Sequence, residues 1–311
     1  MGFSEEKAET VWNLWELDTD QKEPSGDSDE EWRRSLDAYG IKQQLKDAIM
    51  DPEFSYLRLS QSCRHWIKDT MDIHYKSAQR RMFDSERASS TQIFAKPTEG
   101  KKFSDGIEYR PRYPGFFPVY MAVDEDRIHH VFDGEGNLDN LDQLRTTHPS
   151  DFSGSPGCFY FTPQFKLAEL HARYANRRAP TASIAVLSVC VSWEELMRLS
   201  DIGKACSLSG PDWGGYVWGC RNGLTPRPTG LFSKYGKATM LHGWVPRNLD
   251  SWREYARMVI ENEFTSNNVH MLNQPNGSSD WKARQWMFSA SEGAQFLKEH
   301  AKFRVLKYED L

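Results

Sequence analysis

The segment from Gly157 to Arg178 carries the residues best placed for chemistry. A short aromatic run, Cys158 to Phe161, breaks at Thr162-Pro163 into a pattern with apolar residues at helical spacing. Thr162 can accept a hydrogen bond from the first helical turn, and Pro163 suits the first helical position. The pattern therefore predicts a strand, a cap and a helix. It sets Tyr160 and Thr162 at a strand end, where their side chains can face a ligand.

A second group of such side chains lies between Pro211 and Pro228, where three aromatic residues, one acid and four glycines accompany an arginine. Aromatic rings and an arginine can stack on a nucleotide base and bind its phosphate. This makes Asp212, Trp218 and Arg221 candidates for ligand binding. A turn-rich loop whose tryptophans fill the core explains the same composition. Both interpretations of this segment stay open.

The chain lacks the sequence signatures of nucleotide activation and of metal binding. It has no GxxxxGK[ST] segment and no GxGxxG after a predicted strand, so neither a P-loop nor a Rossmann site is indicated. The tract from Asp133 to Asp142 is similar to a calcium loop, but Leu138 and Leu144 occupy the positions of the turn glycine and the bidentate glutamate. Five cysteines without a CxxC pair argue against zinc. We therefore expect no metal and no cofactor, and a substrate that arrives already activated.

Charge is unevenly distributed along the 311 residues, whose formal net charge is −5. Residues 1–31 hold eleven acids and two lysines, so the rest of the chain is mildly basic. A basic surface permits an anionic partner such as RNA, and it equally suits ordinary solubility. The sequence has no run of eighteen apolar residues and no apolar leader, which predicts a cytoplasmic protein without a membrane partner.

The elements that must position these residues fall into three predicted parts. Residues 1–31 form an acidic flexible segment, residues 32–114 a helical region that ends in a long loop, and residues 115–311 an α+β domain. Strands are expected at the short apolar runs 127–132, 158–161, 183–191, 238–245, 285–288 and 303–308. Further helices are expected after the capping box that begins at Ser192 and after Ser289.

Three of these segments, in this order, resemble the ADP-ribosyltransferase fold: RIHHVF, then FYFTPQFKLAELHARYA, then QWMFSASEGAQFL. The resemblance covers roughly residues 127–308 and implies a mixed or antiparallel sheet preceded by the helical N-terminal part. It places His129 or His130 at the first-strand position. It places Tyr160 and Thr162 at the second position and Gln285 at the third.

The third position departs from the family, because active transferases of that fold usually carry a glutamate there. An amide such as that of Gln285 offers a dipole to a cation-like transition state, where a carboxylate offers a full charge. Cleavage of NAD would then need an acid from the preceding segment, for which Glu254, Glu261 and Glu263 are the candidates.

A longer stretch, which also includes ASIAVLSVCV, DWGGYVWGCR and KATMLHGWV, resembles a group of intracellular fungal proteins that extends to the arginine-containing cyclodipeptide synthases. That resemblance implies a transferase of fungal secondary metabolism that joins aminoacyl groups from aminoacyl-tRNA, including arginyl-tRNA, into a diketopiperazine. The ester already stores the energy, which agrees with the missing nucleotide-activating motifs. The enzyme would have to hold a guanidinium, position an amine near a carbonyl and stabilise an oxyanion.

The roles under this hypothesis are divided among the candidates named above and a few others. Asp212 or Glu254 would hold the guanidinium, and Trp218 would also bind substrate. Positioning or proton transfer would fall to His129, Tyr160 and Tyr174, and RNA phosphates would be bound by Arg177, Arg178 and Arg221. An acyl-enzyme, if one forms, would use Cys158 or Thr162. One alternative is an ADP-ribosyltransferase or NAD-cleaving enzyme with NAD as its cofactor. Another is a catalytically silent member of the fold that binds RNA or a protein.

Overall fold

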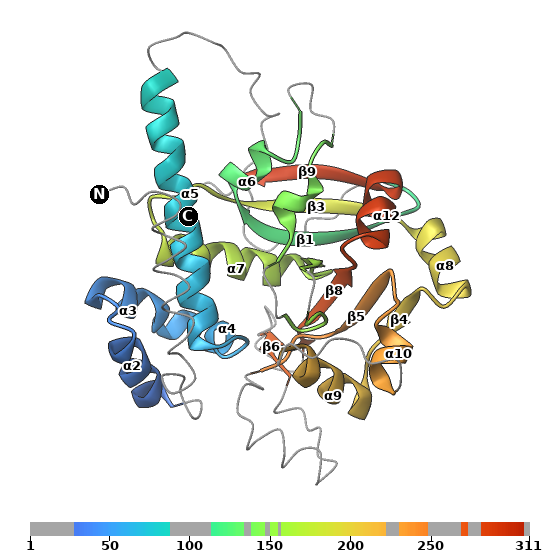
Figure 1. The fold of residues 1–311 in the computed structure, drawn as a ribbon, viewed down its shortest axis with the longest axis horizontal. Coiled ribbons are helices and arrows are strands. Elements are labelled where there is room, and N and C mark those ends of the chain that lie inside the picture. Colours follow the sequence, from blue (N-terminus) through green and yellow to red (C-terminus); the bar gives the residue numbers. More distant parts are fainter. Residues whose placement is uncertain are drawn as a thin grey trace.

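The computed structural model describes residues 28–87, 113–133, 138–146, 150–154, 157–221, 230–247, 269–272 and 281–307. Within these ranges helices and strands both form extended packed layers, so the protein is of the α+β class, as expected (Figure 1). The predicted acidic segment lies almost entirely outside the described residues, as do most of the long loop before residue 113 and the candidates Glu254, Glu261 and Glu263.

The N-terminal region is helical, as its apolar periodicity predicts. Its elements are α2 (Asp29–Ala38), α3 (Gln43–Ile49), the short 3-10 helix η1 (Pro52–Phe54), α4 (Ser55–Arg58) and the long α5 (Cys63–Arg87). Ser28 caps α2 by accepting a hydrogen bond from the Glu31 amide, and Asp51 caps η1 in the same way. The buried side chains of these helices share one apolar cluster with Leu167 and Tyr174 of α7 (Phe165–Arg178). The helical region therefore packs directly on the strand-bearing part.

The strands form two main sheets, and Figure 1 labels most of their strands. The first sheet has the order β1-β3-β9, with both pairs antiparallel: β1 (Phe116–Asp124), β3 (Ile184–Ser192) and β9 (Ala301–Lys307). The second has the order β2-β8-β5-β4, with only the last pair parallel: β2 (Phe159–Phe161), β8 (Arg284–Phe288), β5 (Met240–Trp244) and β4 (Ala205–Ser207). A short pair, β6 (Met271–Leu272) and β7 (Trp281–Lys282), stands apart. Two main-chain hydrogen bonds between Tyr120 and Thr162 join the first sheet to the second.

Strand β3 is buried on both of its faces, which explains its continuous apolar sequence. Its odd-numbered side chains, such as Leu187 and Val189, belong to a core that includes β2, β8 and α12 (Glu292–His300). The even-numbered Ile184 and Val186 pack with the alanines of α7. Further helices complete the fold: α6 (Glu125–His129), η2 (Leu141–Leu144), α8 (Trp193–Asp201), α9 (Gly210–Arg221) and α10 (Leu231–Tyr235).

Three predictions of local structure were wrong. The expected strand 127–132 is instead helix α6 followed by a turn, because Asp124 caps a helix by accepting a hydrogen bond from the Arg127 amide. The strand that precedes it, β1, was not among the expected strands. Residues 210–221 form helix α9 rather than the turn-rich loop of one interpretation, although Trp213 fills the core as that interpretation expects.

The helix after the aromatic strand begins at Phe165, two residues later than the Thr162-Pro163 cap predicts. The Thr162 hydroxyl does accept a main-chain hydrogen bond, but from the Gln164 amide at 3.1 Å, before the helix starts. The other strand predictions and the Ser192 cap, which accepts from the Glu195 amide, were correct.

Candidate functional site

A cavity of about 420 Å³ lies between helix α5, helix α7, strand β1 and the ends of β2 and β8. Helix α5 contributes His65, Asp69, Asp72 and Lys76, whose spacing of four, three and four residues puts them on one helical face. Strand β2 contributes Tyr160, the residue after it is Thr162, and β8 contributes Arg284 and Gln285, so the two predicted strand ends do meet at one site. Acidic and basic residues line the cavity in similar numbers. Such a lining suits a substrate that itself carries charge.

Arg178 and Asp69 form an ion pair in the cavity wall, with 2.7 Å between guanidinium nitrogen and carboxylate oxygen. The Arg178 side chain is only 1% exposed, and it also donates to the Thr70 hydroxyl at 2.6 Å. Its guanidinium lies against the rings of Trp66 and Tyr174, at 4.8 and 4.4 Å from their centroids. Burial opposes ionisation of Asp69, but Arg178 outweighs it and holds the pKa of that carboxyl below its ordinary value. Because its guanidinium is buried and bonded within the protein, Arg178 does not form part of an RNA-binding surface.

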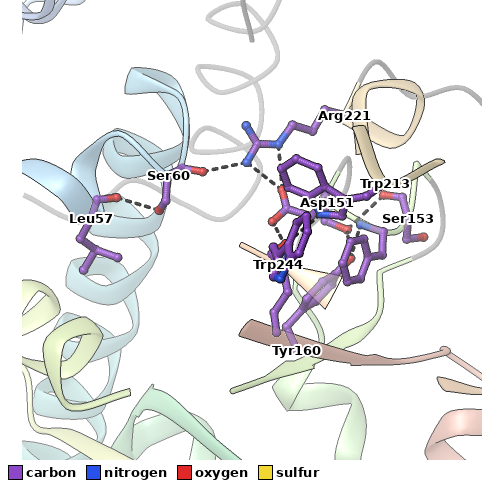
Figure 2. Close-up of polar contacts among 11 residues, drawn as sticks. Leu57, Ser60, Asp151, Ser153, Tyr160, Trp213, Arg221 and Trp244 are labelled. Carbon is purple, nitrogen blue, oxygen red and sulfur yellow. Dashed lines mark hydrogen bonds and ion pairs between the residues drawn. The ribbon is translucent and has the colours of Figure 1, made fainter. Parts of the chain in front are cut away.

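A second ion pair lies at the opposite wall and joins three parts of the chain (Figure 2). Asp151, which is 3% exposed, accepts from Arg221 and from the Gln285 side-chain amide, each at 2.8 Å. Arg221 also donates to the Ser60 carbonyl at 2.7 Å, and the Gln285 amide to the Trp244 carbonyl at 3.2 Å. Both oxygens of Asp151 and the amide nitrogen of Gln285 are thus used within the protein.

The Tyr160 hydroxyl is likewise held by the chain around it (Figure 2). It accepts a hydrogen bond from the Phe152 amide at 2.7 Å and lies 3.0 Å from the Ser150 hydroxyl. Burial raises the pKa of Tyr160 far above its ordinary value, so the phenol stays protonated. Tyr160 can shape the cavity and donate a hydrogen bond, but it does not supply a phenolate.

Asp124 differs from Asp69 and Asp151 because no basic side chain hydrogen-bonds to it among the described residues. The residue is 6% exposed, and one carboxylate oxygen accepts from the Arg127 main-chain amide at 3.0 Å. The Arg127 guanidinium turns away and donates to the carbonyls of Gln143 and Arg145, at 2.7 and 2.9 Å. Burial raises the pKa of Asp124 above its ordinary value, although the charges of Arg127 and Lys76 act in the opposite direction.

Two histidines of the cavity are neutral at pH 7. Burial lowers the pKa of His65, which lies between the two ion pairs of Asp69 and Asp151. Burial lowers the pKa of His171, on helix α7, to about 3, with a further contribution from His270. A neutral imidazole can accept a proton, so His65 is a candidate general base, whereas the low pKa of His171 makes it a weak base near pH 7.

Four of the predicted site residues line the cavity: Tyr160, Thr162, Arg178 and Gln285. Arg221 does not line it but supports it through Asp151. Cys158 is buried, and burial raises the pKa of its thiol, which makes it a poor nucleophile.

The remaining predicted residues lie elsewhere. His129 is exposed at the end of α6 and is not part of a strand, so the first-strand assignment was wrong. Tyr174 is buried and donates to the Ile49 carbonyl at 2.9 Å. Asp212 pairs with Lys234 and Tyr235 of α10, and Arg177 pairs with Asp51 at the surface. Trp218 is half-buried on α9 and also lies outside the cavity lining.

Sequence reasoning missed five residues of the cavity: His65, Asp69, Asp124, Asp151 and His171. The spacing of His65 and Asp69 along a predicted helix was the one available signal, since residues four apart share a helical face. Within the described ranges no group of three or more histidine, cysteine or acidic side chains could hold a metal ion. None of the helices in those ranges is long and apolar enough to cross a membrane. Comparisons of the chain with protein families, curated proteins and solved structures give no match.

Proposed function

We propose that the protein is an aminoacyl-tRNA-dependent transferase that makes an arginine-containing cyclodipeptide. The observation that carries this proposal is the buried carboxylate of Asp124, which faces the cavity without a hydrogen-bonded cationic side chain among the described residues. A buried carboxylate is costly unless a cation or several donors accompany it. Since Arg127 is engaged with main-chain carbonyls, a guanidinium or ammonium group of a ligand would fill this need.

The cavity also contains what acyl transfer from an ester requires. The α-amine of one aminoacyl group attacks the ester carbonyl of the other, so a C–N bond forms and the ester C–O bond breaks. The neutral imidazole of His65 takes the proton from the attacking nitrogen and returns it to the departing 3′ oxygen of the tRNA. A second attack of the same kind closes the six-membered ring. Neither step needs an oxidant or a nucleotide.

We further propose that the fold is ADP-ribosyltransferase-like. Two features support this proposal. The two sheets are joined only at Tyr120 and Thr162 among the described residues, and helix α7 follows strand β2, as the resemblance implies. Within the described ranges nothing in the site favours NAD cleavage, because strand β1 carries no histidine and the Gln285 amide nitrogen is held by Asp151. Asp151, the acid that is hydrogen-bonded to Gln285, is itself neutralised by Arg221.

The experiment that tests the function is the formation of product by the purified full-length chain. The protein is incubated with a mixture of aminoacyl-tRNAs that includes arginyl-tRNA, and cyclic dipeptides are measured by mass spectrometry. We expect an arginine-containing diketopiperazine that is absent when arginyl-tRNA is omitted. If no cyclic dipeptide forms while NAD releases nicotinamide, the protein is an NAD-cleaving enzyme. If neither product forms, the protein is a binding member of the fold.

A further inference from the structure

A row of aromatic side chains runs from helix α8 across strands β1, β8 and β5, and Arg284 of β8 links it to the cavity. Its members, here called the aromatic strip, are Trp193, Phe117, Trp286, His242 and Trp244. The ring centroids of successive members lie 6.0 Å apart from Trp193 to Phe117, 4.9 Å from Phe117 to Trp286 and 5.9 Å from Trp286 to His242. Trp244 stands two residues after His242 on β5, and its ring packs against Trp213 in a separate apolar cluster.

The aromatic strip is accessible along most of its length. Trp193 is 49% exposed, and Phe117, His242 and Trp244 are half-buried. Trp286 belongs to the core, Phe117 packs against the same apolar cluster, and Trp244 packs against a second one. Hydrophobic rings that remain this exposed beside a charged cavity indicate a surface that contacts a ligand.

Two cations flank the end of the aromatic strip that borders the cavity. The Lys282 ammonium lies 4.4 Å from the centroid of the Trp244 ring, and Arg284 is the cross-strand partner of Trp244. Arg284 is exposed and also lines the cavity. Among the described residues neither cation has an acidic partner. Gln164 fixes the main chain here, since its amide donates to the Lys282 carbonyl and accepts from the Arg284 nitrogen, at 3.0 and 2.7 Å.

We propose that the aromatic strip and its two cations bind the unpaired 3′ end of an RNA and lead it into the cavity. Bases can stack on Trp244 and on the exposed rings beyond it, while Lys282 and Arg284 bind the backbone phosphates. The combination of aromatic faces with two cations that lack an acidic partner among the described residues suits RNA better than a protein, whose apolar contact surface would offer those cations no partner. This inference rests on the proposed function for the identity of the RNA, a tRNA.

The test measures binding and needs no product. A 5′-labelled, deacylated arginine tRNA is titrated with the full-length protein, and fluorescence anisotropy gives the dissociation constant at several salt concentrations. The same tRNA trimmed of its unpaired 3′ nucleotides serves as the second probe. The variants are Trp244→Ala and Arg284→Gln, and Lys298→Gln on helix α12 is the matched control for loss of one exposed positive charge.

We expect Trp244→Ala to weaken binding of the intact tRNA by about fivefold or more, the usual effect of removing one stacking ring. Arg284→Gln should lower the slope of log affinity against log salt by about 0.7, the value for one phosphate contact on a single strand. Neither variant should change the affinity for trimmed tRNA, and Lys298→Gln should bind like the wild type. Because Trp244 also packs against Trp213, with ring centroids 5.8 Å apart, the exposed Arg284 gives a readout that does not depend on the core.

The proposal is overturned if intact and trimmed tRNA bind equally well, if Arg284→Gln behaves like Lys298→Gln, or if the protein binds no RNA. These outcomes are separate from failure of the proposed function. A chain that binds the 3′ end through the aromatic strip but makes no cyclodipeptide would refute only the function. A chain that makes cyclodipeptide while both variants bind like the wild type would refute only the aromatic strip as the RNA site.

Discussion

Replacement of Asp124 by asparagine separates the charge of this residue from its structural role. Asparagine caps helices as well as aspartate does, so the hydrogen bond from the Arg127 amide, 3.0 Å long, and the start of α6 should remain. The substitution removes only the negative charge of a residue that is 6% exposed in the cavity wall. A hydrogen bond to a charged group contributes about 1.5–3 kcal/mol. Asp124→Asn should therefore weaken binding of an arginine side chain by about 10- to 150-fold.

Calorimetry with L-argininamide, a stable stand-in for the arginyl ester, measures this loss directly. L-norleucinamide, which lacks the guanidinium, should bind both proteins equally weakly, and Asp201→Asn at the exposed end of α8 should bind L-argininamide like the wild type. Since a cation binds the ionised carboxylate, the wild-type affinity should fall as the pH falls through the raised pKa of Asp124. The variant should lack this pH dependence. Equal affinity of the two proteins for L-argininamide would refute the assignment of Asp124 as the guanidinium site.

Three further predictions concern the walls of the cavity. Arg178→Met should lower the free energy of unfolding by about 3 kcal/mol in urea titrations. This value is at the low end for a broken buried ion pair because the Asp69 side chain is 38% exposed. The control Arg177→Met removes a surface ion pair and should lower the free energy of unfolding by less than about 1 kcal/mol. Because the pKa of Asp69 is lower in the folded protein than in the unfolded chain, the ion pair stabilises the fold fully at any pH above the ordinary aspartate pKa. This stabilisation is lost as the pH falls through the lowered pKa, and acid unfolding of Arg178→Met should show no such loss. Gly157→Ala would place a methyl carbon 2.5 Å from the Thr146 main-chain oxygen, and a thermal melt should show destabilisation of about 1–3 kcal/mol.

The parts of the fold that were predicted correctly are those whose local sequence and tertiary setting agree. The apolar run of β3 is a strand because the structure buries both of its faces. Ser192 caps α8 in the way that its spacing to Glu195 predicts. Strand β8 and the helix that follows it were likewise evident, since the Ser289 hydroxyl accepts from the Gly293 amide at the start of α12.

The errors occur where tertiary pairing decides against local signals. Strand β1 contains Pro118, and a proline normally argues against a strand. It is tolerated because β1 is the edge of its sheet and meets the second sheet only around Tyr120 among the described residues. The segment around His129 and His130 was expected to be a strand because it contains several apolar residues. In the structure these apolar residues reach the core from helix α6 and the turn after it. Ile128 and Val131 are buried there, while His129 is exposed.

The cavity was predictable only in part because its residues are brought together by long-range packing. Tyr160 and Gln285 could be found from strand ends, since β2 and β8 are neighbours in one sheet. Asp124 and Asp151 follow no motif. The first is a helix cap and the second is fixed by Arg221, seventy positions further along the chain. No local pattern encodes a contact at that separation.

The arrangement of charges in the cavity leads to one last consequence for specificity. Asp69 and Asp151 are each neutralised by an arginine of the protein, so a cationic ligand gains little by approaching them. Asp124 has no such partner among the described residues, and its raised pKa shows that ionising it there is unfavourable. A ligand cation would relieve that cost, whereas a neutral side chain would leave it in place. Selection of arginine over an uncharged amino acid would therefore depend on this one carboxylate rather than on the total charge of the cavity.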